Sequence, residues 1–316
     1  MKHFFIINPK AGKKNGAQKL LDAIKSAMRG RDYTTHVTTC AGDATDAARA
    51  FVESGEECRV YACGGDGTLS EVLNGVAGHQ NAALTVIPRG TANDFVRLFG
   101  DADFGDVAAL ADGEERSLDL IETEGMYAID ICSVGFDART ARDVHRFSKL
   151  PLVTGFGAFT ISAIYNLFKG LWSEFVLEAD GERLDGKYSL ICVANARHYG
   201  GGYMPMGDAN PMDGVLDLLL IKKMSRLRVP TLLKKYKEGR YRELGDFAVR
   251  KAVREVKVGF VGRDGVVNMD GEMIHTAAAT IRLAPIKQRF FAPKGAWDAL
   301  DRELESKKRE NERIHV

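Results

Sequence analysis

Five consecutive residues, Gly64-Gly65-Asp66-Gly67-Thr68, bring backbone amides, a carboxylate and a hydroxyl together. The run follows a strand-like segment at 58–63 and precedes a helix-like segment at 69–77. Glycines let a backbone approach a ligand closely, and amides at the start of a helix bind phosphate. Because the Asp66 carboxylate would repel a phosphate, it indicates a metal ion, a ribose hydroxyl or a cationic partner. The run therefore predicts nucleotide chemistry rather than simple anion binding.

Two further loops share this chemistry. The first reads Asn8-Pro9-Lys10-Ala11-Gly12-Lys13, and the second reads Pro88-Arg89-Gly90-Thr91-Ala92-Asn93-Asp94-Phe95. Each combines a glycine with amide, hydroxyl or cationic groups. A single loop of this kind could be only a turn between strands. Three that follow strands of one parallel sheet would meet at the edge where such sheets bind ligands.

The elements around these loops alternate between strand and helix through the first third of the chain. The pattern predicts strands at 2–7, 33–38, 59–63 and 82–87 and helices at 17–28, 44–54 and 69–77. Strand-helix alternation at this spacing predicts an α/β fold with a doubly wound parallel sheet.

From about residue 118 the pattern becomes β-rich. We expect strands at 117–121, 127–133, 174–179, 188–195, 215–222, 252–261 and 280–285, with helical insertions at 138–172 and 225–243 and a charged helix at 297–313. Asp-Gly pairs at 180, 185, 213 and 264 are typical of the turns of an antiparallel sheet. The boundaries we predict are a nucleotide-binding domain at 1–124, a mainly antiparallel β-sandwich domain at 125–292, and a helical segment at 293–316 that packs back on the first domain.

Composition limits the classes of protein that fit. The 316 residues carry a net charge of +1, so no global field attracts nucleic acid, and any membrane contact would be local and peripheral. The five cysteines are scattered without a CxxC pair, which argues against a zinc site or a disulfide framework. We therefore expect a cytoplasmic protein. A homodimer remains open.

The stretch at 150–168 contains no charged residue over 19 positions, which is close to the length of a membrane span. Proline, glycine and polar residues interrupt it. Phe156, Phe159, Ala163 and Leu167 form one helical stripe, whereas Thr160, Ser162 and Asn166 fall mostly off it. The pattern favours an amphipathic helix over a spanning one, and it leaves open a surface that touches lipid without crossing the bilayer.

Two other nucleotide-binding motifs do not match this sequence. A dinucleotide fingerprint needs a third glycine where this chain has Ser70. Residues 181–187 approach a Walker A loop, but Tyr188 replaces the hydroxyl that would bind magnesium. Their place between two expected strands predicts a hairpin turn instead.

The motifs together resemble a known family. The Asn8-Pro9…Gly12 segment, the 64–68 run and Pro88-x-Gly-Thr-Ala-Asn-Asp-Phe95 resemble the catalytic-domain signature of diacylglycerol kinases, in particular the soluble bacterial lipid kinases related to sphingosine and ceramide kinases. Asn195 with Gly200-Gly201-Gly202 and Pro205, Asp213-Gly214, and Asp270-Gly271-Glu272 continue the resemblance in the expected order.

The resemblance implies transfer of the γ-phosphate of ATP, with Mg²⁺, to the hydroxyl of diacylglycerol, which gives phosphatidate at the inner face of the membrane. The implied nucleotide-binding residues are Asn8, Pro9, Lys10, Ala11, Gly12, Thr38, Gly64, Gly65, Asp66, Gly67, Thr68, Glu71, Gly90, Thr91 and Asn93. Thr39 is an alternative register for Thr38.

The resemblance also assigns the proton acceptor and the metals. It places the base in Asp270-Gly271-Glu272, where we favour Glu272 over Asp270; a simple hairpin turn is the alternative. Asp66, Asp94 and Asp119 resemble the magnesium network. Asp213, with carbonyls of Asn210 and Val215, resembles a structural cation loop, for which a type I′ turn is the alternative. Arg139, Arg142, Arg146, Lys149 and Lys169 could approach lipid phosphates, or could belong to a solvated helix face.

Three other functions remain. The acceptor could be another long-chain alcohol, such as a sphingoid base or ceramide. NAD kinases share the Gly-Gly-Asp-Gly-Thr run, although the loop at 88–95 argues against that activity. A regulator that binds nucleotide or lipid without catalysis is the third, and the acids at 66, 94, 270 and 272 argue against it.

Overall fold

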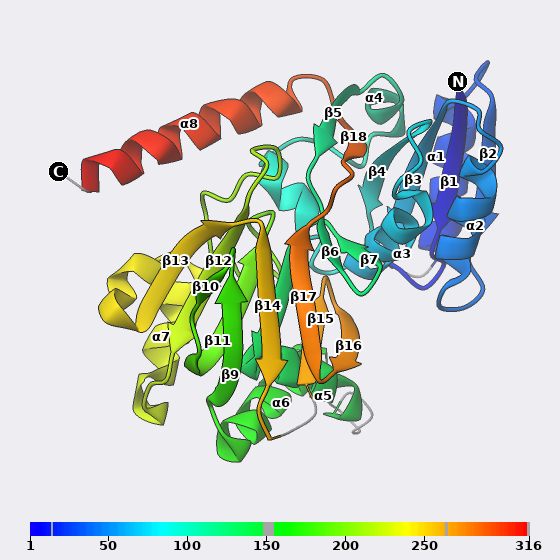
Figure 1. The fold of residues 1–316 in the computed structure, drawn as a ribbon. Coiled ribbons are helices and arrows are strands. Elements are labelled where there is room, and N and C mark those ends of the chain that lie inside the picture. The colour runs from blue at the N-terminus through cyan, green and yellow to red at the C-terminus, as the bar shows by residue number, and fades with distance from the viewer. Residues whose placement is uncertain (14, 148–154, 263–264, 315–316) are drawn as a thin grey trace. The chain divides into compact units, whose positions relative to one another are not determined.

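The computed structural model describes residues 1–13, 15–147, 155–262 and 265–314. The chain divides into two compact units: unit 1 comprises Met1–Leu120 and Pro285–Val316, and unit 2 comprises Ile121–Ala284. Figure 1 shows the elements of each unit.

Unit 1 is built on a six-stranded sheet. Its order is β2 (Tyr33–Val37), β1 (Lys2–Ile7), β3 (Cys58–Gly64), β4 (Ala82–Pro88), β18 (Gln288–Ala292) and β5 (Glu114–Leu118). All neighbours are parallel except β18 and β5. Every residue of β3 is buried, as expected for a strand covered on both faces. The predicted doubly wound parallel sheet is confirmed.

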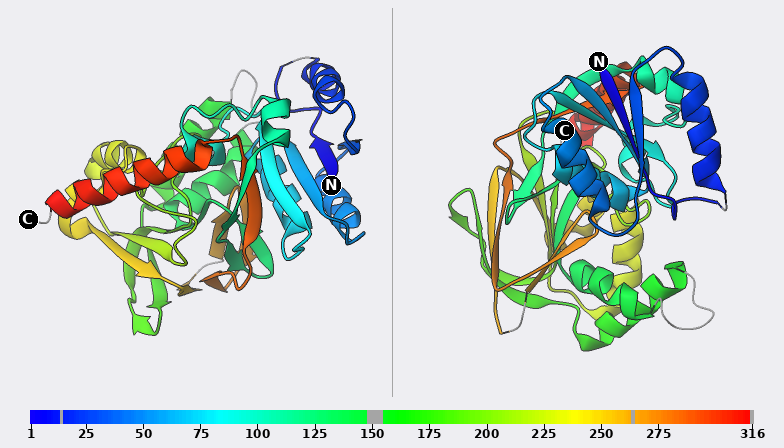
Figure 2. Two further views of the ribbon diagram at one scale, coloured as in Figure 1. Left: turned by 90° about the horizontal axis from the view of Figure 1, so that it is seen from above. Right: turned by 90° about the vertical axis from the view of Figure 1, so that its right-hand side faces the viewer.

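Helices cover both faces of this sheet. They are α1 (Gly16–Ala27), α2 (Asp43–Val52), α3 (Asp66–Val76) and α4 (Val107–Ala111), with the 3-10 helix η1 at Phe95–Phe99. The chain reverses direction in the sheet after β2, so right-handed crossovers put α1 on one face and α2 and α3 on the other (Figure 2). The same crossovers bring the loops after β1, β3 and β4 to one edge.

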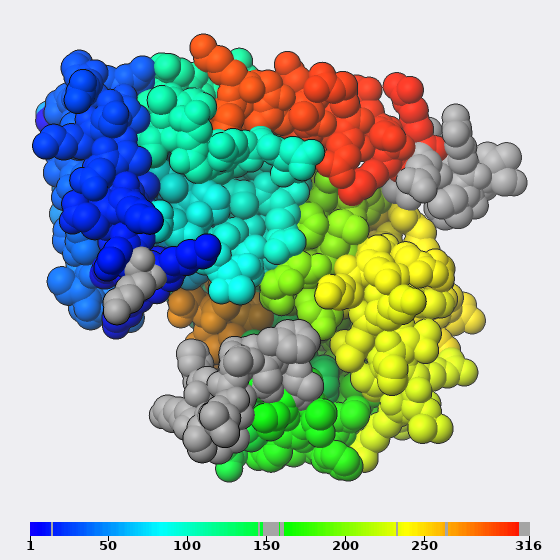
Figure 3. Space-filling view, turned by 180° about the vertical axis from the view of Figure 1, so that it is seen from behind, coloured from blue at the N-terminus to red at the C-terminus, as the bar shows by residue number. Residues whose placement is uncertain are grey.

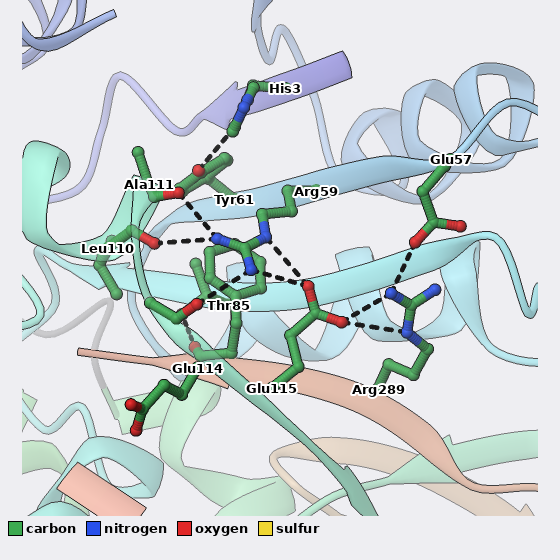
Figure 4. A network of polar contacts seen from close by, with 12 residues as sticks. His3, Glu57, Arg59, Tyr61, Thr85, Leu110, Ala111, Glu114, Glu115 and Arg289 are labelled. Carbon is green, nitrogen blue, oxygen red and sulfur yellow. Dashed lines mark hydrogen bonds and ion pairs between the residues drawn. The ribbon is translucent and has the colours of Figure 1, made fainter. Parts of the chain in front are cut away.

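The end of the chain returns to unit 1, although we had expected residues 285–292 in the second domain. A charged network holds β18 in place (Figure 4). Glu115 accepts hydrogen bonds from Arg59 at 2.8 Å and from Arg289 at 2.6 Å, and Arg289 also pairs with Glu57. In α8 (Ala296–Ile314), Trp297 packs edge-on against Phe99. Sequence pattern alone misses β18 because its partners lie 170 to 206 positions earlier.

Unit 2 is an antiparallel sheet that curls on itself. The main path runs β16 (Glu272–Thr276), β15 (Gly265–Met269), β8 (Ile131–Gly135), β11 (Gly186–Ala194), β9 (Ser173–Ala179), β14 (Glu255–Phe260), β17 (Ala278–Leu283), β6 (Ile121–Thr123) and β7 (Met126–Ala128); β10 (Glu182–Arg183) pairs with β9, and β12 (Leu216–Lys222) joins β11 to β13 (Ala248–Val253). Helices α5 (Phe136–Phe147), α6 (Gly155–Lys169) and α7 (Val229–Lys237) and the 3-10 helices η2 (Arg226–Arg228) and η3 (Tyr241–Phe247) complete the unit.

Several expected strands differ in detail. The expected strand at 252–261 is two strands, β13 and β14, with different partners. They separate at Arg254, whose N–H donates to the Asp180 carboxylate. The strand expected at 117–121 likewise divides between β5 and β6. The hairpin predicted at 181–187 is present. Asp180 and Gly181, which both have positive φ, form the turn that joins β9 to β10.

Helix α6 follows the expected stripe at Leu167, which packs on a hydrophobic cluster, but not the expected place of the polar residues. Ser162 and Asn166 are fully buried against α5, where Ser162 donates to the Thr140 carbonyl at 2.7 Å and Asn166 donates to Asp143 at 3.0 Å. Ile164 and Phe168 are exposed instead. Residues 150–154 of the stretch, Lys149, and the side chains of Phe156, Phe159 and Thr160 lie outside what the structure describes. Among the helices that the structure describes, none is long and apolar enough to cross a bilayer.

Candidate active site

A hollow of about 230 Å³ lies in unit 1 at the ends of β1 and β2 and the start of α3. Six of the predicted nucleotide-binding residues line it: Asn8, Pro9, Lys10, Thr38, Thr68 and Glu71. Thr39 and Cys40 also line it, so both registers that we considered at residues 38 and 39 reach the hollow. The predicted sheet edge therefore carries a concavity, but it is lined from the ends of β1 and β2, from α2 and from α3, and none of the described residues that line it belongs to the loop at 88–95.

Hydrogen bonds join the first loop to the 64–68 run. The side-chain NH₂ of Asn8 donates to the hydroxyl of Thr68 at 3.1 Å, and the side-chain oxygen of Asn8 accepts the N–H of Lys10 at 3.0 Å. A Cβ on Gly64 would overlap the Thr68 side chain, so glycine is required there. The Glu71 carboxylate accepts the N–H of Gly42 at 3.1 Å and so holds the loop before α2.

Asp66 joins the 64–68 run to the loop at 88–95. Its two carboxylate oxygens accept the backbone N–H of Asn93 at 2.9 Å and that of Asp94 at 2.6 Å. Asn93 adopts φ 49° and bonds both ways with the backbone of Gly90. These bonds give the Asp66 carboxylate a structural role that the sequence did not indicate.

The other two acids of the expected magnesium network have cationic partners. Asp94 is buried, with its carboxylate 3.4 Å from Arg97, and the buried Asp119 carboxylate pairs with Lys287 at 2.8 Å. The described residues contain no group of three or more His, Cys, Asp or Glu side chains that could hold a metal. Magnesium commonly binds through one or two carboxylates plus substrate phosphates. The carboxylates of Asp66 and Asp94 could supply these one or two ligands. The magnesium assignment stays a prediction.

Arg89 is a residue of this site that sequence reasoning did not single out. Its guanidinium lies against the first loop and the start of α1: a Cβ on Gly12 would lie 3.5 Å from its Nη2, and a Cβ on Gly16 would overlap it. Among the described residues, the buried Nε of Arg89 has no hydrogen-bond partner. A buried guanidinium donor without an acceptor fits an anionic ligand such as a phosphate group. Its position directly before Gly90 in the quoted loop was the available signal.

The Asp270-Gly271-Glu272 segment in unit 2 forms the hairpin turn between β15 and β16. Asp270 and Gly271 have φ of 48° and 99°, as in a two-residue turn that matches strand twist. The Asp270 carboxylate accepts three backbone N–H groups, from Ile129, Asp130 and Ile131, at 2.7 to 3.1 Å. Glu272 is exposed. The two acids therefore differ: Asp270 is committed to the backbone, whereas Glu272 is available to a substrate.

A chain of hydrogen bonds supports this turn from α5. Asp137 accepts the Ser133 hydroxyl at 2.6 Å, Ser133 accepts the Asn268 amide at 3.4 Å, and the Asn268 carbonyl accepts the N–H of Gly271 at 3.0 Å. Burial raises the pKa of Asp137, while its hydrogen bonds oppose that rise. Nothing in the spacing of these residues marked them as neighbours of the turn.

The loop at Asp213 is a tight turn within unit 2. The N–H of Asp213 donates to the Asn210 carbonyl at 3.5 Å, and the Asp213 carboxylate accepts the N–H of Val215 at 3.2 Å. Gly214 has φ 79° but Asp213 has negative φ, so the alternative of a type I′ turn is wrong. The cation expected at Asn210, Asp213 and Val215 stays a prediction.

Comparison with known proteins decides the family. Residues 2–123 match the family described as diacylglycerol kinase catalytic domain, and residues 130–291 match the one described as YegS C-terminal NAD kinase beta sandwich-like domain. The chain belongs to the diacylglycerol kinase family of lipid kinases. The resemblance drawn from the motifs is thereby confirmed.

Individual members of this lipid kinase family align over most of the chain. A Bacillus subtilis (strain 168) protein named diacylglycerol kinase is 34% identical over 236 residues, which cover 72% of this chain and 77% of the relative. A Pseudomonas aeruginosa PAO1 protein named probable lipid kinase YegS-like is 28% identical over 291 residues, which cover 90% and 93%. A crystal structure of a diacylglycerol kinase from Bacillus anthracis str. Sterne shares the fold, with a TM-score of 0.66 at 20% identity over 93% of this chain and 98% of that one.

Proposed function

We propose that this lipid kinase transfers the γ-phosphate of ATP to the hydroxyl of diacylglycerol and releases phosphatidate and ADP. The observation that carries the proposal is the hollow of about 230 Å³, which the first loop and Thr68 of the 64–68 run both line, while Asp66 joins that run to the loop at 88–95. Membership of the lipid kinase family supports a lipid alcohol as the acceptor. The enzyme would work transiently at the membrane surface, where its acceptor resides.

The nucleotide would bind in unit 1. Amides of Gly65 and Gly67 at the start of α3 would face its phosphates, because a helix N-terminus favours anions. The N–H of Thr68 donates to the Gly65 carbonyl at 3.0 Å, so Thr68 would contribute its side-chain hydroxyl instead. Lys10 and Arg89 would add cationic donors. Magnesium, when bound with the nucleotide at Asp66 and Asp94, would neutralise phosphate charge; Asp119 would belong to the surrounding acidic network.

The acceptor hydroxyl would lose its proton to Glu272. The acceptor oxygen forms a bond to the γ-phosphorus, the bond from that phosphorus to the β–γ bridging oxygen breaks, and ADP departs. A carboxylate base near the hydroxyl contributes to such a transfer, although positioning and charge stabilisation supply most of the catalysis. Asp270 would fix the turn that presents Glu272, because its carboxylate holds three backbone N–H groups.

Radiolabelled ATP, magnesium and detergent micelles containing diacylglycerol test the proposal. We expect label in phosphatidate, and Glu272→Gln should abolish most of it. Ceramide, a sphingoid base and NAD are assayed in parallel. Label in another long-chain alcohol alone would replace diacylglycerol as the acceptor, label in NAD would restore the NAD kinase alternative, and ATP binding without any transfer would indicate a non-catalytic regulator.

A further inference from the structure

Helix α6 of unit 2 turns part of its apolar side toward solvent. Phe168 is 74% exposed and Ile164, one turn earlier, is 51% exposed, whereas the polar Ser162 and Asn166 are buried against α5. Soluble helices normally place these residue types the other way round. The arrangement leaves an apolar strip without a partner among the described residues.

A strongly basic segment begins where β12 ends. Between residues 222 and 237 the chain carries seven Lys and Arg residues and no Asp or Glu, although the whole chain has a net charge of only +1. In its middle, Leu227 is 92% exposed, between Arg226 and Arg228 on the 3-10 helix η2. A large apolar side chain at that exposure, flanked by arginines, is not explained by packing.

The two features are neighbours. Arg226 donates to the carbonyl of Phe168 at 3.4 Å, which joins η2 to the end of α6. Leu167 of α6 and Val229 and Leu233 of α7 pack on the same hydrophobic cluster, so both elements cover one side of the sheet. Figure 3 shows their atoms, green for α6 and yellow for α7, on the same face.

The charges of the basic segment at 222–237 are largely uncompensated. Among the described residues, Lys235 alone of the seven cations forms an ion pair, with Glu243 at 3.5 Å. Glu243 and the nearby Glu238 are themselves paired with Arg240. Lys223 lies over Trp172 at 4.2 Å, and Arg228 over Phe247 at 4.7 Å, contacts that leave their charge in place. The α6–η2 face, defined as Ile164, Phe168, Leu227, Lys222, Lys223, Arg226 and Arg228, thus combines exposed apolar side chains with cations.

We propose that the α6–η2 face docks on a bilayer that contains anionic phospholipid. Exposed apolar side chains enter the headgroup boundary while Lys and Arg beside them attract the negative surface of an anionic leaflet. Nucleic acid would also attract the cations but would give Phe168 and Leu227 no apolar environment. The inference rests on the proposed lipid kinase function, because it supplies the route to a membrane-resident acceptor.

Co-sedimentation of the full chain with vesicles tests the proposal. The vesicles are phosphatidylcholine alone or phosphatidylcholine with phosphatidylglycerol. The charge variant is Lys222→Gln/Lys223→Gln/Arg226→Gln/Arg228→Gln, and the apolar variant is Phe168→Gln/Leu227→Gln. A matched control, Lys19→Gln/Lys25→Gln/Arg29→Gln/Lys294→Gln, removes the same charge from exposed positions of unit 1. Kinase activity is also measured on a short-chain diacylglycerol in neutral detergent micelles.

The unmodified protein should bind anionic vesicles and lose binding as salt rises. The charge variant should bind at least about tenfold more weakly, the apolar variant should also weaken, and the control should match the unmodified protein. Micelle activity should be unchanged in all of them. Equal binding to both vesicle types, or an equal loss in the control, would overturn the docking face. Vesicle binding without any kinase activity would instead refute the proposed function and leave the face intact.

Discussion

Gly65 and Gly90 approach so closely that a Cβ on Gly90 would lie 2.6 Å from the Cα of Gly65. The two residues belong to different loops, after β3 and after β4. No side chain can enter between them without moving backbone. Their contact explains why both loops carry glycine at these positions, independently of any ligand.

Replacing Gly90 by Ala should therefore damage the site mechanically. We expect Gly90→Ala to lower the free energy of unfolding by about 1–3 kcal/mol, because the loops must separate, and to weaken ATP binding. Chemical denaturation and calorimetric titration measure the two effects. Gly67→Ala is the matched control, since a Cβ there meets nothing within 4 Å. Its stability should stay the same or rise slightly, and an equal loss in both variants would contradict the clash.

Asp66→Asn separates the structural role of this carboxylate from a role in metal binding. The side-chain NH₂ of the asparagine would face one of the two backbone N–H groups that donate to the carboxylate in the unmodified protein. Leaving such a donor unsatisfied costs about 1–3 kcal/mol. We expect that loss in denaturation without ATP or magnesium, together with lost turnover. The exposed Asp22→Asn serves as control. Full stability of Asp66→Asn would show that the bonds to Asn93 and Asp94 contribute little.

Glu272→Gln and Asp270→Asn should have opposite signatures. Glu272 is exposed, so Glu272→Gln should change stability by less than about 0.5 kcal/mol but reduce kcat roughly 10²- to 10⁴-fold. Asp270→Asn should destabilise unit 2, because its carboxylate holds three N–H groups. Thermal unfolding and a micelle kinase assay distinguish them. Normal turnover in Glu272→Gln would remove Glu272 as the base.

The alkylation rate of Cys40 measures whether a ligand occupies the hollow. It is exposed and lines the hollow, whereas the other four cysteines are buried. Alkylation of the folded protein should therefore modify Cys40 first. At an ATP concentration ten times its Kd, the rate should fall about tenfold by mass action. Mass spectrometry after iodoacetamide measures it, with Cys40→Ser as the blank and sulfate as the control ligand. An unchanged rate at saturating ATP would place the nucleotide elsewhere.

His3 should make unit 1 sensitive to acid. Burial, assisted by the charge of Arg59, lowers its pKa from 6.5 to about 4, and its ring bonds Tyr61 at 2.8 Å. Between those values the unfolded chain binds more protons, so stability should fall as pH drops from about 6.5 to 4, by on the order of 2–3 kcal/mol. His3→Gln should flatten that dependence in denaturation at each pH. His79→Gln, in the same unit, should retain it; retention in His3→Gln would contradict the assignment.

Local pattern was sufficient for much of this protein. Alternating segments of apolar strand and amphipathic helix determined the parallel sheet of unit 1, because each element must bury one face. The three loops were identified from glycines next to polar residues, because the residues that form each loop are consecutive in the sequence. The order of Gly64–Thr68, residues 88–95 and Asp270-Gly271-Glu272 indicated the family for the same reason.

Contacts between distant residues decided the rest. β18 joins unit 1 through pairing with β4 and β5, and Asp137 reaches Gly271 through Ser133 and Asn268. The role of Asp66 depends on backbone N–H groups 27 and 28 positions away. Phe168 faces solvent because α5 supplies partners for Ser162 and Asn166. In each case a hydrogen-bonding group is satisfied by a residue remote in the chain, and only the tertiary structure determines which residue that is.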